Sequence, residues 1–110
     1  MGDADAFGKL ELELRRGVVV LATLSQLRGA RYGYELRQAL ADRGMPIEEG
    51  TLYPLLSKLR REDLVLYEWQ ESDMGPPRKY YRLTDAGKAQ LAALDDYWTL
   101  INRTVADIGH

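Results

Sequence analysis

The chain has 110 residues, of which 45% are hydrophobic and 29% charged, with a formal net charge of −2. This length predicts a single domain, and this composition is typical of a folded globular protein rather than a disordered one. The chain has no cysteine, and its only histidine is His110. Disulfide frameworks, thiolate nucleophiles, cysteine-based zinc sites and Ser-His pairs are therefore excluded, and we expect no metal, no cofactor and no enzymatic activity.

The sequence shows no apolar run near the roughly 20 residues that a membrane span requires, and its acidic start does not fit a secretory signal. We therefore expect a cytoplasmic protein without membrane contact. Positive charge is not concentrated, because residues 28–83 carry ten Lys or Arg and nine Asp or Glu. Binding to nucleic acid must then depend on where the basic side chains point, not on their number.

The first predicted helix covers about residues 10–27 and follows a flexible N-terminus at residues 1–9. Its apolar side chains recur at spacings of four, four and three, which places them on one helical face. They are Leu10, Leu14, Val18 and Leu21. The neighbouring apolar residues widen this face, so the helix is expected to be covered on more than one side.

A break at residues 28–33 precedes a second, short helix, which carries Leu36 and Leu40 on its core side and Tyr34 on the opposite side. The third helix begins near Glu48, and its leucines at 52, 55, 56 and 59 form the i, i+3, i+4, i+7 stripe of a core-facing helix. Its far face is small, polar and basic. That face comprises Gly50, Pro54, Ser57, Lys58 and Arg61, with Thr51 and Tyr53 on the flanks.

Two segments rich in β-branched and aromatic residues, 64–70 and 78–83, predict a pair of strands. The intervening ESDMGPP is long for a hairpin and contains prolines, so we expect a projecting tongue. Thr84 is a good N-cap for a last helix, whose apolar residues alternate between spacings of three and four as in a heptad seam. These seam positions are Leu91, Leu94, Trp98, Ile101, Val105 and Ile108.

Three helices followed by a two-stranded hairpin are the plan of a winged helix-turn-helix. We therefore predict a mainly α fold with a small β-hairpin, in which residues 10–83 form a winged helix-turn-helix DNA-binding domain. Residues 84–110 form a long C-terminal dimerisation helix.

Four segments resemble the PadR family of bacterial transcriptional regulators, in its short form with one C-terminal helix. They are RRGVVVLATLS, YGYELRQAL and GTLYPLLSKL in the three helices, and GPPRKYYRLTDAGKAQL from the wing into the last helix. The similarity covers roughly residues 10–95. Glu48 departs from the family pattern, which often has serine there, and places a negative charge near the expected DNA face.

The resemblance implies a transcriptional regulator whose GTLYP helix faces DNA. A recognition helix lies in the major groove with its N-terminal residues nearest to the base edges. The expected DNA-binding residues are Tyr34 on the second helix, Gly50, Thr51, Tyr53, Pro54 and Ser57 nearest to DNA on the third, Lys58 and Arg61 on phosphates, and Arg78 and Lys79 in the wing.

Each of these residues also has a purely structural interpretation. Lys58 and Arg61 are compatible with an ordinary solvated face, and Pro54 with a tolerated position near the start of its helix. A proline inside a helix costs about 3 kcal/mol, and such exceptions in a regular element concentrate at functional sites. We therefore favour a role in DNA binding for the exposed face of the third helix.

The seam of the last helix either packs on its own first helix or forms a dimer, and the resemblance favours a homodimer. The expected interface comprises Leu10, Leu14, Val18, Leu91, Leu94, Trp98, Ile101, Val105 and Ile108. A two-fold dimer would place two recognition helices in successive major grooves of a pseudo-palindromic operator. Repression is implied by the resemblance alone.

Trp98, with Tyr97 beside it, has two interpretations. Core packing is one. In some PadR-like regulators an aromatic residue of this helix stacks on planar ligands, so the other is a site for a small planar or aromatic effector.

The alternative from another functional class is a winged-helix module that binds protein instead of DNA. The nine acidic residues in the central segment keep this alternative open. It predicts a neutral or negative potential around Thr51, Pro54 and Lys58.

Overall fold

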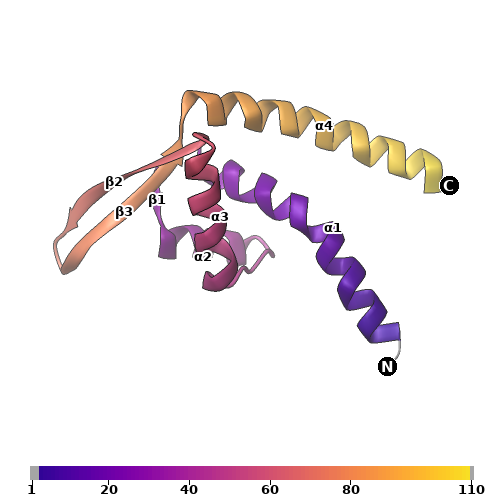
Figure 1. The fold of residues 1–110 in the computed structure, drawn as a ribbon, viewed down its shortest axis with the longest axis horizontal. Coiled ribbons are helices and arrows are strands. Elements are labelled where there is room, and N and C mark those ends of the chain that lie inside the picture. The colour runs from indigo at the N-terminus through magenta and orange to yellow at the C-terminus, as the bar shows by residue number, and fades with distance from the viewer. Residues whose placement is uncertain (1–2, 110) are drawn as a thin grey trace.

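The computed structural model describes residues 3–109, so the outermost residues of the predicted segments 1–9 and 84–110 lie outside the described residues. In chain order its elements are α1 (Asp3–Gln26), β1 (Arg31–Tyr32), α2 (Gly33–Asp42), α3 (Glu49–Arg61), β2 (Val65–Ser72), β3 (Gly75–Leu83) and α4 (Asp85–Gly109) (Figure 1). This order confirms the predicted mainly helical fold with a hairpin wing and a long last helix. Within this range no helix has the length and apolar character needed to cross a membrane.

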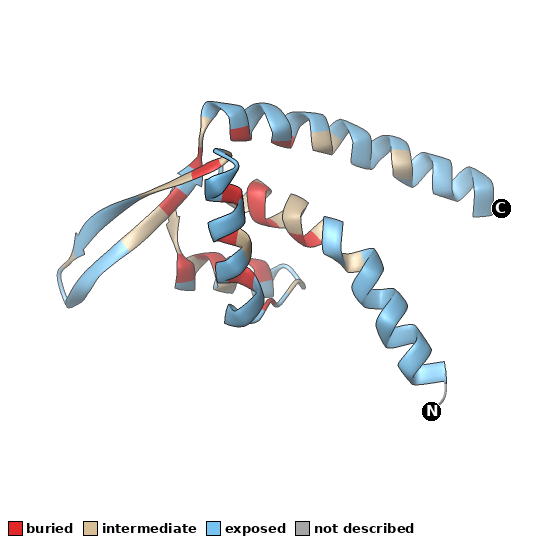
Figure 2. Ribbon diagram, viewed as in Figure 1, coloured by how far each residue is buried: buried red, intermediate tan, exposed pale blue. Residues whose placement is uncertain are grey.

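Leucines from four helices meet in one core beside the root of the wing (Figure 2). The predicted stripe of α3 is confirmed, because Leu52 and Leu56 are fully buried and Leu59 is 3% exposed. Leu24 of α1 and Leu36 of α2 are also fully buried. Each side chain of this size gains roughly 1.5–3 kcal/mol from burial, so these leucines hold α3 in place from behind.

The ends of α2 and α3 follow from local sequence. Gly44 has a φ of 91°, a conformation that glycine adopts without steric cost, and it follows the end of α2. Glu48 is the N-cap of α3 but makes no capping hydrogen bond through its side chain. The negative charge of its carboxylate is still favourable beside the positive N-terminal end of the helix dipole.

The sheet has the strand order β1-β3-β2, with both neighbours antiparallel to β3. The two-residue β1 lies in the segment that the sequence predicted as a break. The predicted long tongue is wrong: β2 runs to Ser72 and β3 starts at Gly75, so only Asp73 and Met74 separate the strands.

The prolines explain that error. Pro76 and Pro77 lie inside β3, where proline is tolerated because it is beside a register shift between Gln70 and Ser72. In addition, β1 pairs with β3 only at Tyr80 and Tyr81. The edge of β3 at the prolines therefore has no β1 partner that needs their missing N–H groups.

Residues 3–9, which the sequence analysis assigned to a flexible N-terminus, belong to α1 in the structure, since this helix begins at Asp3. Asp3 and Asp5 lie in its first turn, where negative charge interacts favourably with the helix dipole. The side chains of residues 3–14 are nevertheless exposed. We call residues 3–18 and 96–109 the arms; both lead away from the side that carries the wing (Figure 1).

The first turn of α4 is bonded to the turn that follows α3. The Thr84 hydroxyl accepts a hydrogen bond from the Gly87 N–H at 2.9 Å, which confirms the predicted N-cap, and donates to the Asp63 carbonyl at 2.7 Å. The Thr84 N–H donates to the Leu64 carbonyl at 3.1 Å. A Cβ on Gly87 would lie 2.0 Å from that carbonyl oxygen. This joint fixes the start of α4 relative to the end of α3.

Candidate nucleic-acid interface

The outer face of α3 is open to solvent. Every residue that the sequence placed on it is exposed, namely Gly50, Thr51, Tyr53, Pro54, Ser57, Lys58 and Arg61. A Cβ on Gly50 would meet no atom within 4 Å. The helix continues through Pro54, although proline cannot donate a backbone hydrogen bond to Gly50 four residues earlier. The face therefore has a low profile along Gly50 and Pro54, with basic side chains further along.

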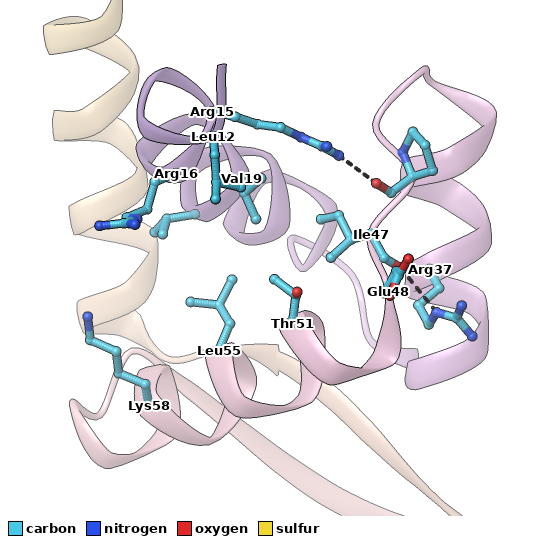
Figure 3. A pocket seen from close by; sticks show the side chains of 12 residues that line it. Leu12, Arg15, Arg16, Val19, Arg37, Ile47, Glu48, Thr51, Leu55 and Lys58 are labelled. Atoms are coloured by element: carbon cyan, nitrogen blue, oxygen red, sulfur yellow. Dashed lines mark hydrogen bonds between the residues drawn. The ribbon is translucent and has the colours of Figure 1, made fainter. Parts of the chain in front are cut away.

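The two flanks of this face border different parts of the molecule. Thr51 and Lys58 lie on the side toward α1, across a pocket that Leu55 also lines (Figure 3). Tyr53 lies on the other side, where its hydroxyl touches Gly33 so closely that any Cβ there would be 2.1 Å from it. The predicted α3 residues thus share one helix but not one environment.

One face of the wing presents a cation–aromatic cluster to α3. Tyr67 and Trp69 of β2 pair in register with Tyr81 and Lys79 of β3. The Lys79 ammonium lies 4.6 Å from the ring centroid of Tyr67 and 5.4 Å from that of Trp69, and the Arg60 guanidinium lies 4.3 Å from the same Tyr67 ring. Rings at these distances attract cations and restrict where they point.

The opposite face of the wing carries a second cluster. The Arg78 guanidinium lies 4.4 Å from the ring centroid of Tyr32. Tyr32 in turn stacks with Tyr34 at 6.4 Å and meets the edge of Tyr80 at 5.4 Å. Arg78 and Lys79 therefore project from opposite faces, as alternation along a strand requires.

The same alternation places Tyr80 and Tyr81 on opposite faces of the wing. Tyr81 is buried at 8% exposure and Tyr80 is half-buried on the other face. Burial raises the pKa of the Tyr81 hydroxyl, and the nearby Tyr53 and Tyr67 add to the rise against a lowering by Arg60. The Tyr81 hydroxyl is therefore neutral at physiological pH.

Sequence reasoning did not name Tyr32, Arg60, Tyr67 or Trp69 as site residues. A signal for two of them was present, because Tyr67 and Trp69 share a face with Val65 by simple alternation. Arg60 lies seven residues after Tyr53, which puts both on the wing side of α3. Its contact with Tyr67 depends on how the wing folds back and has no local signal.

The charges of this surface are largely uncompensated. Ion pairs within residues 3–109 join Arg16 to Glu13, Arg28 to Asp95, Arg37 to Glu49 and Arg82 to Glu68. Within that range the cations of α3 and of Arg78 and Lys79 form no such pair. The distal wing carries Glu71 and Asp73 instead. Positive charge thus gathers on α3 and at the middle of the wing, not at its tip.

The predicted seam of α4 divides into two parts. Leu91 is 3% exposed and packs in the core of its own chain, so it is not available as an interface residue. Further along, Trp98, Ile101 and Val105 face Leu14 and Val18 of α1 across a groove of about 630 Å³. Tyr97 does not line this groove and is 57% exposed. The structure therefore separates the two aromatic residues predicted as an effector pair.

In the part of the chain that the structure describes, no three His, Cys, Asp or Glu side chains gather as metal ligands would. The exposed groups are cations, hydroxyls and aromatic rings, which are the groups that contact phosphates and bases.

Comparison with known proteins points the same way. The model of the transcriptional regulator PadR-like family matches residues 20–93. A PadR family transcriptional regulator from Eggerthella lenta DSM 2243 is 43% identical, with a TM-score of 0.87 over 96% of this chain and 93% of that one. A PadR-like regulator from Bacillus cereus strain ATCC 14579 is 34% identical, with a TM-score of 0.78 over 87% and 95%. A transcriptional regulator from Mycobacterium tuberculosis is 40% identical over 60 residues, which cover 54% of this chain and 55% of that protein.

Proposed function

The chain belongs to the PadR-like family of transcriptional regulators, and from this premise we propose that it is a homodimeric repressor that binds operator DNA through α3 and the wing. One observation carries the proposal most directly. The exposed face of α3 continues, through Arg60 on the Tyr67 ring, into the cations of the wing. A duplex lying on α3 would meet the positive charges of α3 itself and, beside them, those of the wing.

In the proposed complex α3 enters the major groove. Gly50 and Pro54 allow close approach of the helix, and Thr51, Tyr53 and Ser57 lie nearest to the base edges. Lys58 and Arg61 bind phosphates one or two turns further along the helix. Contacts of this kind position the protein without reading sequence.

Around the helix, Arg78, Lys79 and the Tyr34 hydroxyl add backbone contacts, and Arg60 joins them. Arg78 and Lys79 leave opposite faces of β3, so they reach different phosphates, or a phosphate and the minor groove. The aromatic rings beneath Arg60, Lys79 and Arg78 restrict these long side chains before DNA arrives. Less side-chain entropy is then lost on binding.

Support for the homodimer comes from the arms. Leu10, Leu14, Val105 and Ile108 are 68%, 80%, 60% and 80% exposed in the single chain. Apolar exposure on this scale, along two neighbouring helices, is typical of an interface. The groove between α1 and α4 offers Val18, Ile101 and Trp98 to the same partner. Leu94 is partly buried against the core of its own chain. Two-fold pairing would match α3 to grooves about 34–36 Å apart on a pseudo-palindromic operator.

The proposal also includes release of the protein from DNA when a small planar effector binds. Trp98 is 42% exposed at the groove between α1 and α4, so a flat ligand there would contact the element that sets the dimer geometry. An effector acts only if it binds the DNA-competent and DNA-incompetent dimers with different affinity.

The test is fluorescence anisotropy with DNA from upstream of the protein's own gene, against a scrambled duplex, over a range of salt. We expect a preference for the native DNA and affinity that falls steeply with salt. Arg61→Gln should weaken binding to both duplexes by about three- to tenfold and flatten the salt slope, whereas Thr51→Ala should change the preference between them.

Arg103→Gln, on the exposed surface of α4, is the matched control and should leave DNA binding unchanged. Equal weak binding to both duplexes, insensitive to Arg61→Gln, would refute the recognition role of α3. It would favour a winged helix that binds protein instead.

A further inference from the structure

A pocket of about 670 Å³ lies between α1 and α3, on the flank of α3 that faces away from the wing (Figure 3). Its walls are apolar side chains from three segments: Leu12 and Val19 of α1, Ile47 of the preceding loop and Leu55 of α3. Sites for small molecules have volumes of about 300–1,000 Å³, mostly apolar walls and a few convergent polar groups. By size and lining this pocket is of that kind.

The polar groups of the pocket differ at its two ends. Arg37 is held by Glu49 at 2.9 Å and by the Ile47 carbonyl at 3.3 Å, and Arg15 donates to the Pro46 carbonyl. Those two guanidiniums already form hydrogen bonds within the chain. Arg16 and Lys58 lie on the same side of the pocket in Figure 3, away from Arg37. Arg16 has only a 3.7 Å pair with Glu13, and Lys58 forms no ion pair within residues 3–109.

We infer that this pocket binds a small amphipathic anion, a carboxylate or sulfonate attached to an apolar body. The head would pair with Arg16 and Lys58, and the body would lie along Leu12, Val19 and Leu55. Charge complementarity selects this class, because the only acid among the lining residues is Glu48. A neutral apolar molecule would leave the cationic end without a partner.

Occupancy of the pocket competes with DNA. This step depends on the proposed function, in which Lys58 binds a phosphate from α3. An anion paired with Lys58 neutralises the positive charge that this side chain would otherwise offer to a DNA phosphate. Because coupling between two sites is reciprocal, bound operator DNA must lower the affinity for the anion by the same factor by which the bound anion lowers the affinity for DNA.

The first experiment needs no DNA. The full-length protein is titrated with 8-anilinonaphthalene-1-sulfonate and, in parallel, with N-phenyl-1-naphthylamine, which has the same rings without the sulfonate. Lys58→Gln and Arg16→Gln should each weaken the sulfonate probe by about three- to fivefold, a change expected for a partly exposed charge pair. Both variants should leave the neutral probe unchanged.

Matched controls remove one positive charge from the same helices outside the pocket. Arg61→Gln on α3 and Lys9→Gln on α1 should not change either affinity. If Lys58→Gln and Arg16→Gln leave the sulfonate affinity unchanged, the probe lies elsewhere and the inference is overturned. A second outcome would also overturn the inference. If the sulfonate probe does not bind and the two pocket variants shift the monomer–dimer equilibrium, a second copy of the chain occupies the pocket.

The second experiment adds operator DNA to the probe-saturated protein. Competition predicts displacement of the sulfonate probe, reduced in Lys58→Gln, with the neutral probe retained. Charge-dependent probe binding with no displacement by bound DNA would overturn the competition. A protein that binds the probe in this way but binds no DNA would contradict the proposed function and leave the pocket assignment standing.

Discussion

The core around α3 and the two arms are built from similar residues but reach opposite states. Leu24, Leu36 and Leu52 are fully buried in the core, whereas Leu10 and Leu14 in the first arm are 68% and 80% exposed. Both sets repeat at helical spacing. The core leucines find partners within the chain, and those of the arms do not.

The dimensions of the molecule express the same difference. Its radius of gyration is 16.2 Å, against about 13 Å for a compact domain of this length. The excess comes from α1 and α4, which diverge from the core toward the two termini (Figure 1). Periodicity in the sequence therefore predicts that a face will be covered, but not whether the cover comes from the same chain.

The largest effect should come from truncating the core. Leu52→Ala removes a fully buried side chain, and such changes cost about 2–5 kcal/mol of unfolding free energy. Leu14→Ala, the same change in an arm, should have an effect that depends on protein concentration, because it acts on association. Urea unfolding at two concentrations separates the two behaviours. Equal, concentration-independent losses would abolish the distinction between core and arm.

A charge in the second arm should act on association alone. Val105→Asp would bury a carboxylate in the proposed dimer interface and weaken association by about a hundredfold, with the helical signal in circular dichroism retained. Analytical ultracentrifugation gives the readout. Ala106→Asp, one residue further along and outside the seam, is the control. An unchanged dimer in Val105→Asp would rule out this face as the interface.

Two glycines sharpen the comparison at a smaller scale. Gly87→Ala drives a methyl group against the Leu64 carbonyl and should cost about 1–3 kcal/mol. Gly17→Ala, in the arm of α1, meets no atom within 4 Å and should stabilise the helix by about 0.5–1 kcal/mol. Thermal unfolding of both variants provides the measurement, and a change of the same sign in both would contradict the assigned packing.

Much of the fold was predictable because its signals are local. The α3 stripe and the Thr84 cap each depend on residues within one or two turns, and both are confirmed. β1 has only two residues, and it is a strand only because Tyr80 and Tyr81 lie beside it. The prolines of ESDMGPP indicated a loop because the free edge of β3 is not visible in the sequence.

The candidate site divides in the same way. Exposure of the α3 face follows from helical geometry and is confirmed. The contact of Arg60 with Tyr67 and the separation of Thr51 from Tyr53 depend on how α1 and the wing pack around α3. These contacts join residues that are distant in the sequence, or belong to different elements, and no spacing rule reports them.

The joint between Thr84, Asp63 and Leu64 makes α4 a lever whose short end is attached beside the end of α3. At 1.5 Å per residue, the 25 residues of α4 extend about 37 Å from that attachment. A tilt of about 5° at the joint therefore corresponds to a shift of roughly 3 Å at the far end. Conversely, a shift of a few ångströms at the far end of α4, where the proposed dimer would pair it with the partner chain, corresponds to a rotation of only a few degrees at α3. In the proposed dimer on operator DNA, small changes in the spacing of the two α3 helices would therefore accompany larger movements at the far ends of α4.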